Sequence, residues 1–273
     1  MDKLNTSLRI GLSRSSVTLL RTSGWSRPRR EVLTEYPLDG SSSQQILEGL
    51  RAALVDASCA KLATTVVLAD DWARLFMVTP PHNAEWLRDC KAAAALRFQS
   101  LYGEPPQDWT IDADWEAQHP FLACALPRSI LGALQQVGAE RRLTFVSIMP
   151  QFVATWNRWR RGVHANTWYG TVHADALTLG VISGRRLVDL RRLAVPFAAC
   201  LDQTWLPEQI AREALRLALP VPERIHLCGC VPDAWMTQGP VGPACVRLDA
   251  VPPAPDLASE SAGATLAYTG ARA

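Results

Sequence analysis

Apolar and polar positions alternate through the first part of the chain in short blocks separated by polar turns. Three strand-sized apolar runs come first, and a helix-sized run with apolar residues spaced three and four apart follows. A run of serines precedes that helix and can cap it. The β-branched run ATTVVL then predicts a buried strand. The predicted elements are strands at 8–12, 16–21, 31–36 and 63–68, and a helix at 44–55.

A second pattern interrupts this order at about residues 70–126. A strand at 72–78 stops at two prolines, and a long helix reaches Tyr102. Its apolar positions, three and four residues apart, share one face: Leu87, Cys90, Ala94, Phe98 and Leu101. Strands at 108–112 and 121–126 follow. We therefore expect a small inserted α+β subdomain.

The remaining pattern repeats the first part. A helix starts after Pro127 and is expected to end near Gly138, a strand follows at 142–148, and a helix runs from Pro150 to about 160. Strands at 168–172, 177–182, 186–190 and 225–228 and a helix from Thr204 then restate the first order. This predicts an α/β fold of two ribonuclease-H-like halves, at 1–161 and 162–249. After Pro232 the signal fades, and 250–273 is expected to be a flexible tail.

Composition narrows the class of protein. Hydrophobic residues make up 48% and charged residues 20% of the 273 residues, which is typical of a globular protein. A formal net charge of +2 does not by itself indicate nucleic-acid binding. The seven scattered cysteines and the lack of a signal peptide favour reduced thiols in the cytoplasm. No apolar run reaches the roughly 18 residues of a membrane span, so a partner would hold the protein at a membrane.

Four segments resemble one family of bacterial proteins: IGLSRSSVTLL, TTVVLADDWARLFMVTPP, CALPRSILGALQQVGAERRLTFVSIMP and TVHADALTLGVISGRRLVDLRRLAVP. They are similar, in order and spacing, to the actin-like cytoplasmic proteins of type IV pilus assembly and type II secretion. These are PilM, the MshI-type proteins and the cytoplasmic domain of GspL. The resemblance covers residues 8 to 230 and implies an actin-like fold.

The resemblance also directs attention to two turns that hold phosphates in the ATP-binding members. There the first turn carries an Asp that positions metal or water, and a Gly that lets backbone N–H groups approach phosphate. Here Gly11 takes the place of the Asp and Ser13 that of the Gly. In the second turn the two places are taken by Thr171 and His173, and the adenine-side loop has Gly229 alone. We expect no catalytic residues, no bound cofactor and no ATP hydrolysis.

Other candidate chemistry has a simpler explanation. Cys228-X-Cys230 lacks the second ligand pair that zinc sites use, so buried strand-end thiols are favoured over a metal site. Four aspartates lie at predicted strand ends and turns, where Asp is common for backbone reasons: Asp70, Asp71, Asp112 and Asp114. We therefore expect no metal site.

Ten tryptophans in the chain suggest a binding surface, because Trp is enriched at binding hot spots. We expect a groove beside the inserted helix, at Trp86, Phe98 and Tyr102. The resemblance implies its ligand: PilM-like proteins take the cytoplasmic peptide of a membrane protein with one span into such a groove. Nucleic acid is not an expected partner, contact with the membrane is indirect, and self-association stays open.

The sequence thus favours a non-catalytic actin-like scaffold at the cytoplasmic face of the inner membrane, in a pilus or secretion assembly platform. The first alternative is an ATP-binding ATPase or kinase relative in which Asp175 or Asp70 coordinates Mg²⁺. A second alternative is a regulatory or nucleic-acid-binding protein that uses the arginine clusters. These clusters are Arg27/Arg29/Arg30, Arg158/Arg160/Arg161, Arg185/Arg186 and Arg191/Arg192.

Overall fold

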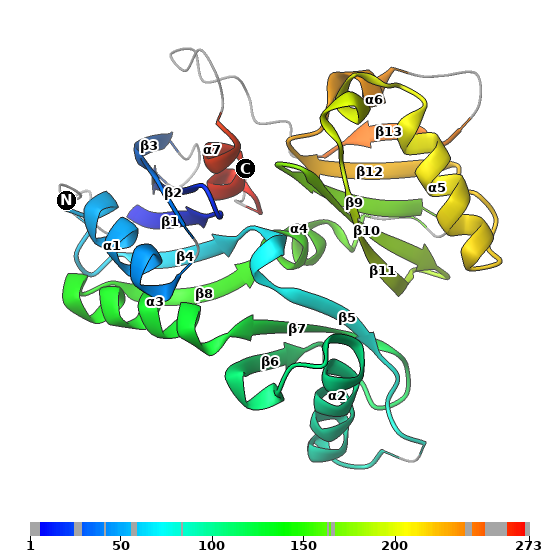
Figure 1. Cartoon of the computed structure of the whole chain (residues 1–273), viewed down its shortest axis with the longest axis horizontal. Coiled ribbons are helices and arrows are strands. Elements are labelled where there is room, and N and C mark those ends of the chain that lie inside the picture. The colour runs from blue at the N-terminus through cyan, green and yellow to red at the C-terminus, as the bar shows by residue number, and fades with distance from the viewer. Residues whose placement is uncertain are drawn as a thin grey trace. The chain divides into compact units, whose positions relative to one another are not determined.

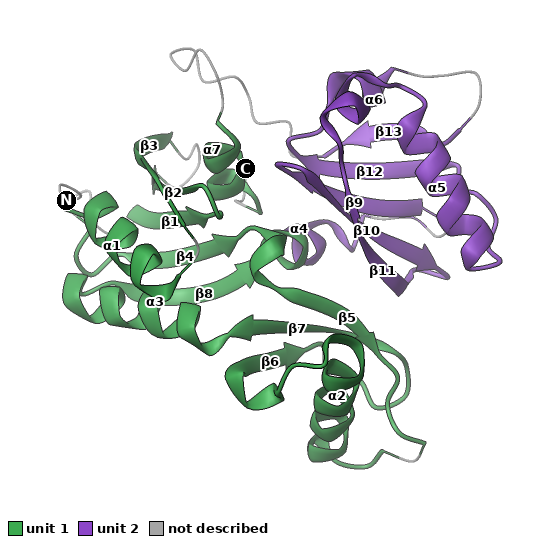
Figure 2. Ribbon diagram, viewed as in Figure 1, with its two compact units in different colours: residues 1–154, 253–273 green, residues 155–252 purple. Residues whose placement is uncertain are grey.

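The computed structural model contains two compact units, residues 1–154 with 253–273 and residues 155–252 (Figures 1 and 2). It describes residues 6–24, 29–40, 42–55, 59–82, 84–162, 164, 167–237, 242–248 and 261–270. The division between the units falls inside helix α4 (Gln151–Trp159). The expected boundaries at 161/162 and 249/250 differ from this division, and much of both neighbourhoods lies outside the described residues.

The first unit is built on a five-stranded sheet in the order β3-β2-β1-β4-β8. β1 and β3 pair antiparallel with β2, whereas β4 pairs parallel with β1 and β8. Helices α1 and α3 contact each other and share a core with Leu8, Ile10 and Leu12 of β1. The bounds are β1 Thr6–Leu12, β2 Ser16–Ser23, β3 Arg29–Pro37, α1 Ser43–Ala53, β4 Ala63–Leu68, α3 Arg128–Arg141 and β8 Thr144–Pro150.

Local sequence explains how the two helices begin and end. Ser42 caps α1 through a capping box, in which its hydroxyl accepts from Gln45 N and the Gln45 side chain accepts from Ser42 N. The expected end of α3 at Gly138 was wrong, because the helix continues to Arg141 and ends at Arg142 in the left-handed conformation. Gly138 is needed inside the helix instead, since a side chain there would overlap the Phe145 ring.

Between β4 and α3 the chain forms a second, three-stranded antiparallel sheet in the order β5-β7-β6. Helix α2 packs on it, and the two enclose a core of their own centred on Phe76, Phe98 and Phe121. Residues 70–72 form a 3-10 turn rather than the start of the expected strand. The bounds are η2 Asp70–Trp72, β5 Arg74–Val78, α2 Leu87–Tyr102, η3 Pro106–Asp108, β6 Trp109–Ala113 and β7 Phe121–Pro127.

The second unit repeats the strand order of the first, as β11-β10-β9-β12-β13. Its core lies between this sheet and α5, and includes Trp168, Ile210 and Trp235. Gly184 and Arg185 both have positive φ, as the two-residue hairpin turn between β10 and β11 requires. The bounds are β9 Thr167–His173, β10 Ala176–Ser183, β11 Arg186–Ala194, η4 Phe197–Leu201, α5 Trp205–Arg216, β12 Arg224–Gly229, α6 Asp233–Met236 and β13 Ala244–Arg247.

The expected flexible tail is corrected at its end. Residues 262–268 form helix α7 (Ala262–Tyr268), which packs on β1 and β2 of the first unit. Leu266 and Ala267 are fully buried there. Gly11 touches α7, whereas its strand neighbours Ile10 and Leu12 belong to the core shared with α1 and α3. Because successive strand residues point to opposite faces, α7 covers the face of the sheet opposite α1 and α3.

Among the described residues, no helix is both long and apolar enough to span a membrane.

Candidate functional site

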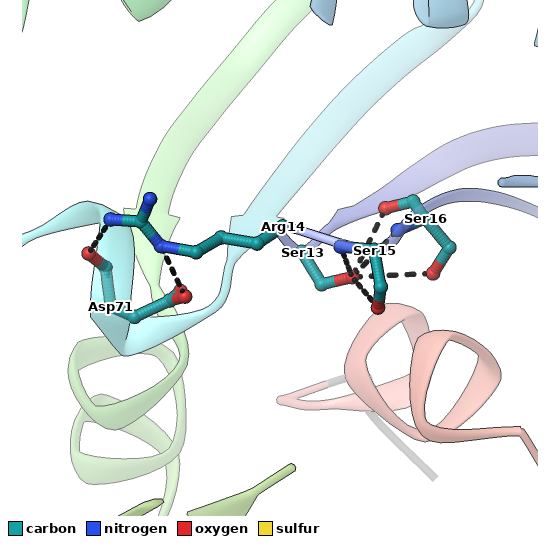
Figure 3. A network of polar contacts seen from close by, with 5 residues as sticks. All are labelled: Ser13, Arg14, Ser15, Ser16 and Asp71. Atoms are coloured by element: carbon teal, nitrogen blue, oxygen red, sulfur yellow. Dashed lines mark hydrogen bonds and ion pairs between the residues drawn. The ribbon is translucent and has the colours of Figure 1, made fainter. Parts of the chain in front are cut away.

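The turn between β1 and β2 is held together by its own serines (Figure 3). The Ser13 hydroxyl accepts hydrogen bonds from the backbone N–H groups of Ser15, at 3.2 Å, and Ser16, at 3.0 Å. The Ser13 N–H donates in turn to the Ser16 carbonyl at 2.9 Å. Three of the turn's backbone N–H groups are therefore bonded within the turn.

This bonding matters for phosphate binding. A phosphate loop works because several backbone N–H groups converge on the ligand oxygens. Here the Ser13 hydroxyl occupies two of those donors, and a strand carbonyl occupies the third. A phosphate at this turn would have to break these bonds.

Arg14, at the tip of the turn, is also engaged. Its Nε lies 2.7 Å from Asp71 Oδ2, and its Nη2 donates to the Asp71 carbonyl at 3.2 Å. The guanidinium lies 4.6 Å from the centroid of the Trp72 ring. Figure 3 shows the Arg14 side chain running from the serines toward Asp71. The ion pair joins the turn to η2, and the sequence analysis did not foresee it because the partners are far apart in the chain.

Gly11, at the place of the Asp in ATP-binding relatives, lies directly against α7. A Cβ on Gly11 would be 2.9 Å from both Ala267 N and Gly263 O. Real Cβ atoms essentially never come this close to backbone atoms, so α7 leaves no room for a carboxylate at this position. The site therefore lacks the acid and also the space for it.

In the second unit, the turn between β9 and β10 keeps no obvious phosphate ligand. Thr171 is buried in β9, and the turn itself consists of Ala174 and Asp175. The Asp175 carbonyl accepts from Val195 N at 2.7 Å, while its side chain lies at the surface. Gly229, at the end of β12, has a φ of +88°, a conformation that favours glycine.

The thiols and acids singled out in the sequence are accounted for by packing. The Tyr169 hydroxyl donates to Cys228 Sγ at 3.2 Å in the interior of the second unit. Asp70 Oδ1 accepts from Phe152 N at 2.8 Å, which caps the first turn of α4. Asp112 accepts from the Trp115 indole N–H at 3.1 Å. Across the described ranges, no three His, Cys, Asp or Glu side chains gather as a metal site.

The structure does not bring the three predicted partner residues together. Trp86 is the residue before α2 and is 61% exposed, whereas Tyr102 is the last residue of this 16-residue helix. At about 1.5 Å per residue, more than 20 Å separate the two positions along the helix axis. Phe98 is 0% exposed and packs between Phe76, Tyr102 and Trp109. The expectation that Phe98 lines a groove is therefore corrected: it is a core residue.

No protein-family model matches the chain, and no curated protein matches it in sequence. Solved structures do resemble it. A chain of the PilM–PilN type IV pilus biogenesis complex matches with a TM-score of 0.59 and 13% identity, over 84% of this chain and 82% of that one. A Bacteroides thetaiotaomicron protein with an actin-like ATPase fold and unknown function gives 0.58 and 14%, over 85% of each chain.

The cytoplasmic domain of EpsL, an inner-membrane component of the Vibrio cholerae type II secretion system, matches with a TM-score of 0.53. The identity is 12%, over 90% of this chain and 86% of that domain. These neighbours support the resemblance drawn from the sequence. The chain has the actin-like fold, and proteins of pilus assembly and type II secretion are among its structural neighbours.

Proposed function

We propose that the protein is a non-catalytic actin-like scaffold. It binds the cytoplasmic segment of an inner-membrane protein with one span, in the assembly platform of a type IV pilus or a type II secretion-like system. It lies in the cytoplasm and reaches the inner membrane through that partner. The names of two structural neighbours, one a PilM–PilN complex and one an inner-membrane component of type II secretion, support this proposal.

The observation that carries the non-catalytic part is the closed turn between β1 and β2. Its N–H groups are bonded to Ser13 and Ser16, and Gly11 has no space for a metal-positioning acid. Stabilising the charge of a transferring phosphoryl group needs donors that are free and already aimed at it. A turn that bonds to itself offers none.

The partner surface is assigned to the inserted subdomain. Four large apolar side chains on or next to α2 are exposed to solvent, although the subdomain has a complete core of its own: Trp86, Leu87, Leu96 and Leu101. The Arg88 guanidinium lies 5.5 Å from the Trp86 ring. Exposed aromatic and aliphatic groups beside a cation suit a peptide that gains affinity by burying its own apolar side chains.

The test is a binding titration with the full-length protein. Synthetic cytoplasmic segments of the one-span membrane proteins encoded beside this gene are labelled, and their fluorescence anisotropy is followed as protein is added. We expect one segment to bind saturably. Trp86→Ala should weaken it about tenfold or more, as loss of a Trp hot spot does. Leu215→Ala is the matched control, because Leu215 is equally exposed but lies on α5 of the second unit.

If no segment binds, the scaffold proposal is wrong. If a segment binds and Trp86→Ala and Leu215→Ala leave its affinity unchanged, the partner surface lies elsewhere than the start of α2.

ATP binding remains the second candidate, because Asp175 is exposed beside the second turn, where a carboxylate could reach Mg²⁺. A ligand that binds only the native state stabilises it by RT ln(1 + [L]/Kd), about 2.7 kcal/mol at one hundred times Kd. Saturable thermal stabilisation by Mg-ATP that is lost in Asp175→Asn would favour this candidate. No stabilisation at millimolar Mg-ATP would exclude it.

A further inference from the structure

The face of the first sheet beneath α7 is polar, unlike the face beneath α1 and α3. On β1 and β2 it carries Arg9, Ser16 and Thr18, which alternate with the buried Leu8, Ile10 and Val17 of the other face. Thr18 pairs with Glu35 of β3, so that carboxylate lies on the same face. A sheet face that only packs a helix would be apolar. This face carries groups that bind ions.

The contact between α7 and this face is also incomplete. The Thr18 hydroxyl is fully buried and makes no hydrogen bond within the described part of the chain. Gly263 of α7 sits over it, so closely that a Cβ there would overlap the Thr18 hydroxyl and lie 2.8 Å from Ser16 Oγ. A buried hydroxyl without a partner disfavours the docked state. Release of α7 would return Thr18 to solvent or to a ligand.

Arg9 binds the other end of α7. Its Nε donates to the Ala267 carbonyl at 2.8 Å, and its Nη2 donates to the Thr269 carbonyl. The guanidinium thus holds two oxygens at once, the arrangement in which arginine binds phosphate or carboxylate. The carbonyl end of a helix carries partial negative charge. The end of α7 therefore stands on Arg9 where the oxygens of an anion would stand.

We propose that α7 is a reversible internal occupant of an oxyanion-binding surface, formed by the Arg9 guanidinium and the Ser16 and Thr18 hydroxyls. The expected ligand class is a diphosphate group. Gly263 and Ala267 are four residues apart, which is about 6 Å along the helix axis. A diphosphate carries oxygens at both ends of a comparable span. Glu35 offsets part of the positive charge of this face.

Two features make the release of α7 physically reasonable. The helix has seven residues, and helices this short do not persist in water without tertiary contacts. Docking and folding of the segment are therefore one step. Local openings of such segments need less free energy than global unfolding. A ligand that binds only the open face shifts this opening equilibrium in proportion to its own affinity.

The experiment compares amide hydrogen exchange of residues 261–270 with calorimetric titration of inorganic pyrophosphate in the full chain. In the wild type, exchange of α7 should become faster as pyrophosphate is added. Gly263→Leu should displace α7 and increase pyrophosphate affinity at least tenfold, and adding Arg9→Gln should remove that gain. Gly132→Leu is the matched control, because Gly132 lies on α3 with no atom within 4 Å of its added Cβ.

The outcomes are decisive in each direction. If Gly263→Leu exposes α7 but pyrophosphate does not bind, the oxyanion surface is wrong. If α7 stays protected in that variant, the reversible contact is wrong. Leu266→Gln, which weakens docking without a clash because Leu266 is fully buried, guards against misfolding of the first variant. If both variants unfold the whole protein, α7 is an integral part of the fold and the proposal is overturned. None of these results depends on partner binding, so the scaffold proposal is tested separately.

Discussion

Replacing Gly11 by Ala tests the contact between β1 and α7 with a single added carbon. That carbon would lie 2.9 Å from Ala267 N and Gly263 O and 3.1 Å from Ala267 Cβ. Ordinary contacts are 3.4–4 Å, so α7 must shift by several tenths of an ångström or detach. Overpacking of this kind costs about 1–3 kcal/mol. Since Gly inside a strand is itself unfavourable by roughly 0.5–1 kcal/mol, an open site would have given the opposite sign.

The assay is urea unfolding of the full-length protein, followed by circular dichroism, with amide exchange of β1 to identify the transition of the first unit. Gly132→Ala is the control: its added Cβ meets nothing within 4 Å, and Ala is the better helix former by about 1 kcal/mol. We expect Gly11→Ala to lower the free energy of unfolding of the first unit and Gly132→Ala to raise it. A Gly11→Ala protein as stable as the wild type would refute the close packing of α7.

Three further changes test separate contacts. Asp70→Ala leaves the Phe152 N–H without its acceptor and should lower the free energy of unfolding by about 1–3 kcal/mol, while Asp70→Asn should cost less; similar melting of both variants would contradict the cap. Phe98→Ala removes a core ring and should cost about 3–5 kcal/mol in urea unfolding, whereas a loss below about 1 kcal/mol would argue for a surface position. Hydrogen bonding to Arg51 holds the pKa of Glu140 at about 2, below its ordinary value of 4.5. The stabilisation is therefore complete above pH 4.5 and is lost as pH falls toward 2; Glu140→Gln should flatten the acid dependence of Tm, and an unchanged profile would contradict this.

The order of elements was predictable because it depends on local signals. The apolar stripe of α1, the serine cap before it and the β-branched run of β4 lie where the sequence predicts them. Helix α7 was missed, although residues 262–268 contain no helix breaker of the proline type. Its sequence, AGATLAY, is made of small residues, and it forms because Gly11 and Arg9 receive it from a distant part of the chain. No local pattern contains that information.

The candidate site was predictable in part for the same reason. The absence of an acid at position 11 is visible in the sequence, but the closure of the turn depends on Arg14 reaching Asp71. Phe98 shows the opposite case. Helical spacing placed it on the core face with Cys90 and Ala94, and the structure buries all three. That periodicity already excluded Phe98 from an exposed groove, and it deserved more weight than the general preference of partners for aromatic residues.

The claim that this actin-like unit holds a partner rather than hydrolysing nucleotide rests on the closed turn between β1 and β2. The most direct measurement is calorimetric titration of the full-length wild-type protein with Mg-ATP, with released phosphate assayed in the same samples. We predict no saturable heat at millimolar Mg-ATP and no phosphate release above that of buffer. Saturable binding near one nucleotide per chain, accompanied by phosphate release, would contradict the account.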